Sequence, residues 1–482
     1  MDQLDIAKVG RRSVQGISAL ISRTFFLNII SYGASLVIFT ILSPREIGVY
    51  TAAIAGQRII SFFADFGLGA ALVQRREQLT RDDLTTVFTL QMLTTFFLFL
   101  LVIFTQGFIV SFFKLGEAGA RLFLVLVFLV FLSSFKTIPS ILLERAINFQ
   151  KLIVPQIIEA FIFNLVLVAL VLKGLGIDGY TWAFLIAGIV GIPFYYLVSP
   201  WKIGIGITRK SLGHLRYGIQ FQAKNVLATV KDDFLTVFLA KILSFAELGY
   251  IGFAQRNAFF AYRFIVDNVT KVTFSTYSRL QNNKKMLKNA IEKSLFFVSA
   301  SIFPLLLGII ITAPYIVSYF PKWQGKWEPA LLSLTFFSLN ALISSLSGIL
   351  VNVLDATGRV KLTLKLMTLW TLLTWIFTPI LIYLYGYNGV SIASFLIALT
   401  IVLTIFLVKK VVEFSFFKSI LKPLACSIIM AIFVFVSAPL YVKDLLTLGI
   451  IIGGGALIYA ISLYSIARRD LEADIKMIFA KT

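Results

Sequence analysis

The chain has 482 residues, of which 59% are hydrophobic and 47 are phenylalanine, and its mean hydropathy is +0.91. Apolar segments this long and numerous exclude a soluble globular protein and indicate a chain that crosses a membrane many times. The single cysteine (Cys426) and single histidine (His214) exclude a disulfide framework and a Cys/His metal site, and no cofactor is expected. The net charge of +21 is explained by basic cytoplasmic loops rather than by nucleic acid as a partner.

The hydropathy pattern predicts an all-α polytopic membrane protein with about fourteen transmembrane helices, since about 20 residues cross a bilayer. In chain order, the predicted spans are 15–42, 46–73, 85–110, 119–140, 152–172, 178–199, 217–240, 247–278, 291–318, 329–353, 362–385, 388–408, 420–442 and 445–467. The first sixteen residues, MDQLDIAKVGRRSVQG, are polar and lack a cleavage site, so we interpret them as a cytoplasmic lead-in to the first span.

The distribution of basic residues predicts the orientation of these spans. With the N-terminus inside, 29 of the 44 Lys and Arg residues fall in cytoplasmic segments, 8 in external loops and 7 within spans. Lys136 is assigned here to the cytoplasmic segment that follows the fourth span. The bias follows the positive-inside rule, so both termini are predicted to be cytoplasmic. All external loops are short, and no soluble domain is expected on either side.

Three pairs of segments indicate an internal repeat with a spacing of about 200 residues. GIDGYTWAFLIA (176–187) resembles GYNGVSIASFLIA (386–398), EIGVY (46–50) resembles ELGYI (247–251), and the loop 146–151 resembles 356–361. The copies have the same orientation, which is typical of parallel repeats related by an axis along the membrane normal. We therefore predict two six-helix lobes, 1–215 and 216–410, followed by two C-terminal helices in 411–482. The basic, glycine-containing segment 200–217 is predicted to be a flexible tether between the lobes.

The eighth predicted span carries a stripe of charge. Arg256, Arg263, Asp267 and Lys271 recur at i, i+7, i+11 and i+15, so they share roughly 80° of one helix face. The i,i+4 pairs within this set could form a purely structural ladder, but that ladder leaves Arg256 without an acid on its face. Ionisable groups at membrane depth usually face a bundle interior or a wet cavity. Three cations against one acid favour a cavity for an anion.

Other intramembrane charges lie mainly in the first, second and seventh spans. The predicted substrate-binding residues are Arg23, Arg58, Lys224, Lys231, Arg256, Arg263 and Lys271. The predicted counter-ions or ion-coupling groups are Asp65, Asp232, Asp233, Asp267 and Glu159. Arg23, Lys224 and Lys271 lie near helix ends, where snorkelling to the interface is the alternative. The sequence leaves open whether Asp232 and Asp233 neutralise Lys231, form a counter-ion network, or bind a coupling proton or sodium ion.

The excess of cations indicates the chemistry of the ligand. The planar fork of arginine suits phosphate oxygens, and basic pockets between helices recognise lipid head groups. A lipid-linked phosphate or diphosphate is therefore the predicted ligand. An inside-negative membrane potential favours outward movement of an anion by about 2.3 kcal/mol per charge per 100 mV. A head group of charge near −2 would therefore gain roughly 4–5 kcal/mol of free energy on moving outward. Such transport needs no ATPase.

The segments PREIGVY (44–50) and FFADFGLGAALVQ (62–74) resemble the Wzx-type oligosaccharide flippases of the multidrug/oligosaccharidyl-lipid/polysaccharide exporter superfamily. The resemblance implies alternating access between two lobes. It implies export of undecaprenyl-diphosphate-linked oligosaccharide repeat units across a bacterial cytoplasmic membrane, for O-antigen, capsule or exopolysaccharide. Membrane lipids are expected partners, and the sequence leaves open whether the basic loops contact a polysaccharide polymerase or glycosyltransferases. By placement, the basic residues of that family on helices one, two, seven and eight match Arg23, Arg58, Lys231, Arg256 and Arg263.

Three alternatives stay open. A cation-coupled multidrug antiporter would favour an acidic cavity, whereas a lipid II-type flippase cannot be separated by charge. A membrane glycosyltransferase or polymerase needs catalytic carboxylates at a membrane face, but the longest external loop contains only Glu117. Asp82 and Asp83 are interpreted as a cap of the third span, and Gly204-x-Gly206 precedes no strand-to-helix transition. The sequence therefore does not favour an enzyme.

Overall fold

The computed structural model describes residues 27–64, 69, 72–73, 77, 79–146, 148–208 and 226–479, with side chains as far as Arg468. Within these ranges the regular structure is helical and no strand is assigned, as predicted. Three predicted site residues, Arg23, Asp65 and Lys224, lie outside the described residues.

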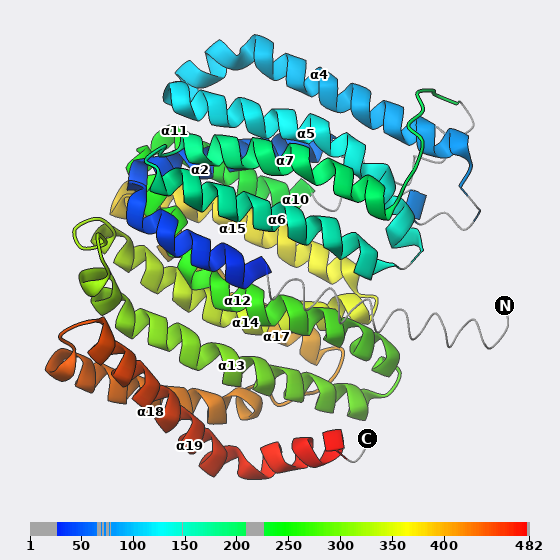
Figure 1. Ribbon diagram of the computed structural model, residues 1–482. Coiled ribbons are helices and arrows are strands. Elements are labelled where there is room, and N and C mark those ends of the chain that lie inside the picture. Colours follow the sequence, from blue (N-terminus) through cyan, green and yellow to red (C-terminus); the bar gives the residue numbers. More distant parts are fainter. Residues whose placement is uncertain are drawn as a thin grey trace. The chain divides into compact units, whose positions relative to one another are not determined.

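The helices follow the predicted spans closely. Eleven of them are long and apolar enough to cross a membrane. Helix Leu27–Ile41, the continuous α10–η1–α11 segment and the charged α12 complete the fourteen predicted helices among the described residues. Their bounds are α2 Pro44–Ala64, α4 Arg81–Phe113, α5 Gly116–Arg145, α6 Phe149–Leu172, α7 Asp178–Val198, α10 Val226–Thr229, η1 Val230–Phe234, α11 Leu235–Ile242, α12 Phe245–Leu280, α13 Lys284–Tyr319, η2 Glu328–Ala330, α14 Leu331–Ala356, α15 Val360–Tyr385, α16 Asn388–Ala398, α17 Ile401–Lys409, α18 Phe416–Tyr441 and α19 Leu445–Phe479 (Figure 1).

Local capping sets where several of these helices begin. Thr80 and Asp83 form a capping box at the start of α4, so the predicted capping role of the Asp82–Asp83 pair is confirmed and belongs to Asp83. The repeated motif Ser-x-x-Glu-x-Gly, at 43–48 and 244–249, opens α2 and α12 in the same way. In each copy the glutamate accepts hydrogen bonds from the backbone N–H and hydroxyl of the serine at 2.7–2.8 Å.

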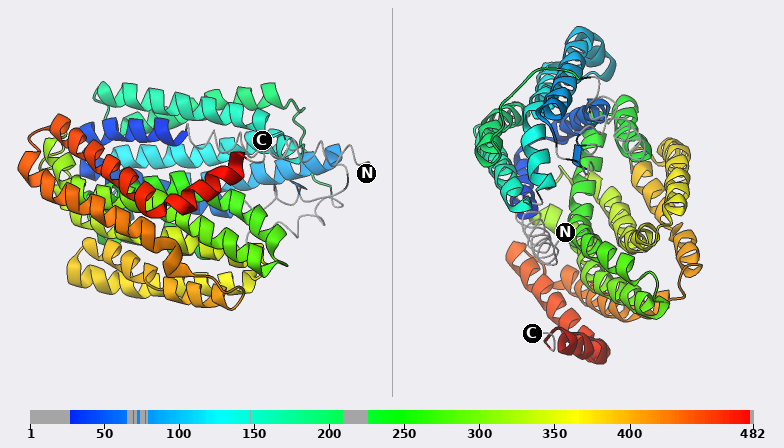
Figure 2. Two further views of the ribbon diagram at one scale, coloured as in Figure 1. Left: turned by 90° about the horizontal axis from the view of Figure 1, so that it is seen from below. Right: turned by 90° about the vertical axis from the view of Figure 1, so that its right-hand side faces the viewer.

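The chain packs into two compact units, Met1–Gly249 and Tyr250–Thr482. In the first unit, α4, α5, α6 and α7 run side by side as long helices (Figures 1 and 2). Leu122, Ile138 and Val171 are fully buried among them. The segment α10–η1–α11 packs on α2 in this same unit. The predicted lobe boundary at residue 215 comes from the sequence repeat and stays a prediction, whereas the compact units follow from packing.

Two glycines allow a close approach between the starts of α2 and α12 within the first unit. A methyl group at Gly48 would overlap the carbonyl oxygen of Phe245, and one at Gly249 would overlap the carbonyl oxygen of Pro44. The two contacts are reciprocal because each glycine belongs to one copy of the repeated motif. Only a residue without a side chain fits at either position.

The segment 200–208 differs from the prediction of a flexible tether. The backbone N–H groups of Gly206 and Thr208 donate to the hydroxyls of Thr89 and Thr86 at 3.0 and 3.1 Å. The ring of Trp201 packs edge-on against Phe88, with ring centroids 5.3 Å apart. These contacts attach the segment to α4, so the predicted flexibility is wrong for its first nine residues.

The second unit is built around a core from α12, α13 and α14. Val266, Tyr277, Ile302, Leu350 and Val353 are buried there, and α18 packs against α13. The ring of Phe253 is stacked on Trp327 at a centroid distance of 4.4 Å. One face of α12 is therefore buried in the core of the second unit, and the charged stripe lies on another face of the helix.

Candidate functional site

Arg58 lies in α2, fourteen residues from its first residue Pro44, which corresponds to roughly 21 Å along the helix axis. Its Nη1 is 3.5 Å from Oδ1 of Asp233 in η1. The Asp233 side chain is 16% exposed, whereas that of Arg58 is 59% exposed. The structure therefore brings together two predicted site residues from helices two and seven, and leaves part of the guanidinium accessible.

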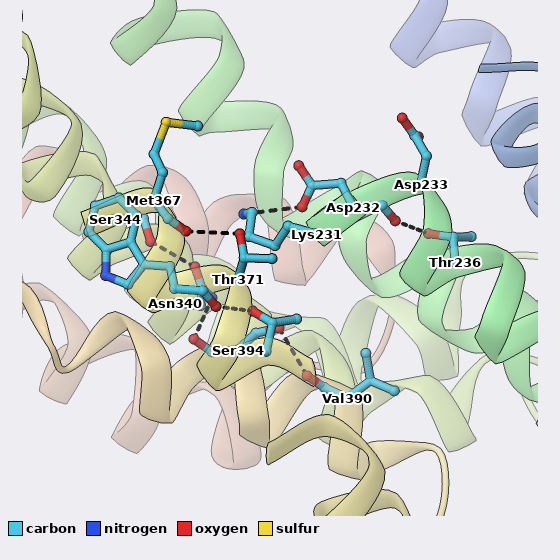
Figure 3. A network of polar contacts seen from close by, with 12 residues as sticks. Lys231, Asp232, Asp233, Thr236, Asn340, Ser344, Met367, Thr371, Val390 and Ser394 are labelled. Atoms are coloured by element: carbon cyan, nitrogen blue, oxygen red, sulfur yellow. Dashed lines mark hydrogen bonds and ion pairs between the residues drawn. The ribbon is translucent and has the colours of Figure 1, made fainter. Parts of the chain in front are cut away.

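The seventh predicted span contains a turn of π-helix, Val230–Phe234, between α10 and α11. Within this turn, Lys231 Nζ lies 3.1 Å from Oδ1 of Asp232, and Asp233 points away from Lys231 (Figure 3). The hydroxyl of Thr236 donates to the Asp232 carbonyl at 2.7 Å. Single π turns inside α-helices occur frequently at functional sites. The charge pattern identified the residues, but no sequence signal indicated the π turn.

Helix α12 presents its charged residues on one side. Arg263, Asp267 and Lys271 are exposed and Arg256 is half-buried, whereas Val266 and Tyr277 are buried in the second unit. These positions match the predicted stripe. The amide of Asn352 in α14 donates to the Thr270 carbonyl at 2.9 Å and to the Thr273 hydroxyl at 2.8 Å.

Glu159 in α6 pairs with Lys136 in α5, with Nζ and Oε1 2.6 Å apart. The assignment of Lys136 to a cytoplasmic segment is wrong, because the lysine lies inside α5 and its side chain is only 15% exposed. Its ammonium group also lies 5.8 Å from the Tyr195 ring centroid in α7. The sequence signal that pointed to Lys136 was Glu159, an acid within the neighbouring apolar span.

A proline next to this pair explains a further polar contact. Pro139 has no N–H to offer the carbonyl of Phe135 four residues earlier, and the Tyr196 hydroxyl donates to that carbonyl at 3.0 Å. Lys136, Glu159 and Tyr196 thus link α5, α6 and α7.

The second unit contains an uncharged polar network. The Asn340 amide in α14 donates to the Ser394 carbonyl in α16 at 2.7 Å, and the Ser344 hydroxyl donates to Oδ1 of Asn340 at 2.9 Å (Figure 3). These bonds satisfy polar groups within helices that cross the membrane.

The charged side chains of the candidate site are basic and acidic groups in close pairs or in a stripe. In the part of the chain that the structure describes, no group of three His, Cys, Asp or Glu residues is arranged to hold a metal ion. The pairs Arg58–Asp233 and Lys231–Asp232 together offer a guanidinium and an ammonium group with two carboxylates. The stripe on α12 offers three cations and one carboxylate, and guanidinium and ammonium groups are suited to phosphate oxygens.

The fold is that of multi-pass membrane transporters. A solved structure of the lipid II flippase MurJ in an inward closed conformation matches with a TM-score of 0.77 at 19% identity, covering 94% of this chain and 99% of that one. An inward-facing multidrug resistance MATE family transporter of the MOP superfamily matches with a TM-score of 0.64 at 16% identity, covering 80% and 94%. At these identities the similarity establishes the fold alone.

The family follows from the sequence. The family described as "Polysaccharide biosynthesis protein" matches residues 37–331, more than half of the chain, and this protein belongs to that family. An uncharacterized membrane protein in the cps region of Klebsiella pneumoniae is 23% identical, covering 96% of each chain. The lipopolysaccharide biosynthesis protein WzxC of Escherichia coli (strain K12) is 22% identical, covering 82% of this chain and 81% of its own. The predicted Wzx-type resemblance is thereby confirmed.

Proposed function

We propose that this protein is a flippase that moves a polyprenyl-diphosphate-linked oligosaccharide from the cytoplasmic to the outer leaflet of a bacterial cytoplasmic membrane by alternating access. The observation that carries the proposal is the pair Arg58 and Lys231. Arg58 lies roughly 21 Å along the helix axis from the start of α2, and Lys231 in η1 lies roughly 16 Å from the end of α11, in a protein of the polysaccharide biosynthesis family. Membrane-embedded cations are costly and mark pathways for charged substrates.

The diphosphate is the group that these cations would bind. Guanidinium and ammonium groups, such as those of Arg58 and Lys231 in the first unit or of Arg256 and Arg263 on α12, donate charge-assisted hydrogen bonds to phosphate oxygens. Lys271, Arg23 and Lys224 complete the proposed set. The membrane potential drives an anionic head group outward, at about 2.3 kcal/mol per charge per 100 mV. No covalent step is required, so the protein acts as a carrier rather than as an enzyme.

The orientation of the proposed carrier has both termini in the cytoplasm, supported by the excess of Lys and Arg in alternate loops. In this orientation the Ser-x-x-Glu-x-Gly turns are external. The basic loops then face the cytoplasm, where glycosyltransferases that build the lipid-linked substrate are the proposed partners. A polymerase would receive the substrate on the outer side.

The paired acids of the first unit weigh against a multidrug antiporter. A pocket for an organic cation needs a carboxylate that the substrate can neutralise, but Asp232, Asp233 and Glu159 each lie beside a lysine or arginine. The similarity to MurJ keeps a lipid II-type substrate as the second candidate, because that substrate also carries a polyprenyl diphosphate.

Reconstitution in liposomes tests the proposal. Wild-type protein is expected to reorient a polyprenyl-diphosphate-linked sugar, and Arg58→Ala and Arg256→Ala are expected to abolish this movement without loss of folded protein. The matched control is Lys443→Ala, which removes an exposed cation from the external turn before α19. Unimpaired flipping in both site variants would refute the cation site. Transport of organic cations against a proton or sodium gradient, without lipid movement, would refute the flippase.

A further inference from the structure

Arg58 and Lys231 each have a carboxylate partner from the same π turn. Arg58 pairs with Asp233, and Lys231 pairs with Asp232. These four groups sum to zero formal charge. A diphosphate would enter a region where both cations have a partner.

The π turn explains how adjacent acids serve two different cations. Neighbouring side chains on a helix diverge, and i,i+1 pairs do not normally face each other. In the turn Val230–Phe234, Asp232 nonetheless lies beside Lys231, while Asp233 points away from it (Figure 3) and contacts Arg58 on α2. The Asp232 side chain is 64% exposed, so it can leave Lys231 for water without being stranded.

We infer that Asp232 and Asp233 are resident competitors of the substrate, which return to Lys231 and Arg58 and thereby promote release of the diphosphate. The inference rests on the proposed function, because it assigns the two acids a role at the same site. Carboxylate and phosphate oxygens bind the same donors, so the substrate competes with both acids for the two cations. Their return to the cations then offsets the free energy that dissociation would otherwise cost.

The competition has a kinetic signature. Without the carboxylate, the cation is free in the empty carrier, so the substrate binds more tightly but leaves more slowly. Each pair has one well-exposed member, Arg58 at 59% and Asp232 at 64%, so solvent screening limits each pair to roughly a two- to fivefold change in affinity. A carrier limited by release then has both a lower KM and a lower kcat, whereas a merely structural role of the acids would lower kcat without tightening binding.

The test measures binding of farnesyl diphosphate to the purified full chain by calorimetry, and the initial flipping rate against lipid concentration in liposomes. Asp232→Asn and Asp233→Asn are each expected to bind the probe roughly two- to fivefold more tightly and to lower KM and kcat together. Glu117→Gln is the matched control, because Glu117 is a 96% exposed carboxylate beside Arg121, remote in sequence from this site.

Double variants keep the test decisive if a single variant folds poorly. If Asp233 acts through Arg58, the double variant Arg58→Gln/Asp233→Asn has the same probe affinity as Arg58→Gln alone. In the same way, Lys231→Gln/Asp232→Asn has the same probe affinity as Lys231→Gln alone. Unchanged or weaker binding in both single Asp variants would overturn the inference while leaving the cation site intact. If Arg58→Gln and Lys231→Gln themselves leave probe affinity unchanged, the proposed diphosphate site fails, and the inference fails with it.

Discussion

The reciprocal glycine contact between the starts of α2 and α12 gives the sharpest structural prediction. We consider Gly48→Ala, which adds one methyl group. That methyl would overlap the carbonyl oxygen of Phe245, a backbone atom that cannot yield by changing a rotamer. Overpacking of this kind costs about 1–3 kcal/mol. Gly249→Ala should behave in the same way, because its methyl would overlap the carbonyl oxygen of Pro44.

This cost applies to the conformation in which the two helix starts are in contact. In an alternating-access carrier, a conformation that separates them would escape the penalty. A penalty of about 1–3 kcal/mol therefore shifts the ratio of the two conformations by roughly 5- to 150-fold toward the separated one. Lipid flipping is expected to fall, because the carrier seldom returns to the closed contact.

Cysteine labelling measures the shift. A cysteine at Ser43 in a Cys426→Ser background is expected to react faster with a membrane-impermeant maleimide when Gly48→Ala is present, since Cys426 is the single native cysteine. Gly33→Ala is the matched control, because a methyl group there meets no atom within 4 Å. Equal labelling rates and equal melting temperatures for Gly48→Ala and Gly33→Ala would refute the reasoning.

Three further predictions concern packing and capping. Lys136→Met leaves the Glu159 carboxylate without its partner and should lower the free energy of unfolding by up to about 3 kcal/mol, whereas adding Glu159→Leu should restore most of that loss in denaturation experiments. Asn352→Leu removes two hydrogen bonds to α12 and should lower thermal stability by about 1–3 kcal/mol, a result that an unchanged melting curve would contradict. The pKa of Asp444 is lowered because the Thr447 backbone N–H and hydroxyl donate to its carboxylate. Asp444 therefore stabilises the start of α19 above the ordinary carboxyl pKa, and this stabilisation is lost as the pH falls through the lowered pKa. Hydrogen exchange at the start of α19 should become faster at low pH, and Asp444→Asn should abolish this pH dependence.

Much of the fold could be predicted because its signals are local. A helix that crosses a membrane needs a continuous apolar run, and its ends are set by caps such as Thr80–Asp83 that lie within one turn. The predicted starts of the sixth and twelfth spans, at Asp178 and Asn388, are the first residues of α7 and α16. The charged stripe on α12 also follows from helical spacing alone.

The partners of the charges could not be predicted in this way. Asp65 is the acid seven residues after Arg58 in the sequence and lies outside the described residues, whereas the contact of Arg58 in the structure is with Asp233 on another helix. Lys136 was counted with a cytoplasmic segment, whereas the structure places it inside α5 beside Glu159 of α6. Whether a charge inside an apolar run is paired depends on which helix packs beside it.

The sequence by itself determined the spans, the cap of the third span, the similar segments EIGVY and ELGYI and the excess of cations, since each depends on residues within a few turns of one another. Only the tertiary structure decided that Asp233 contacts Arg58, that Glu159 contacts Lys136, and that Gly48 and Gly249 each meet a distant carbonyl oxygen. These contacts join residues far apart in the chain. Their free energies depend on the distance and burial that helix packing sets, and hydropathy and periodicity carry no information about either.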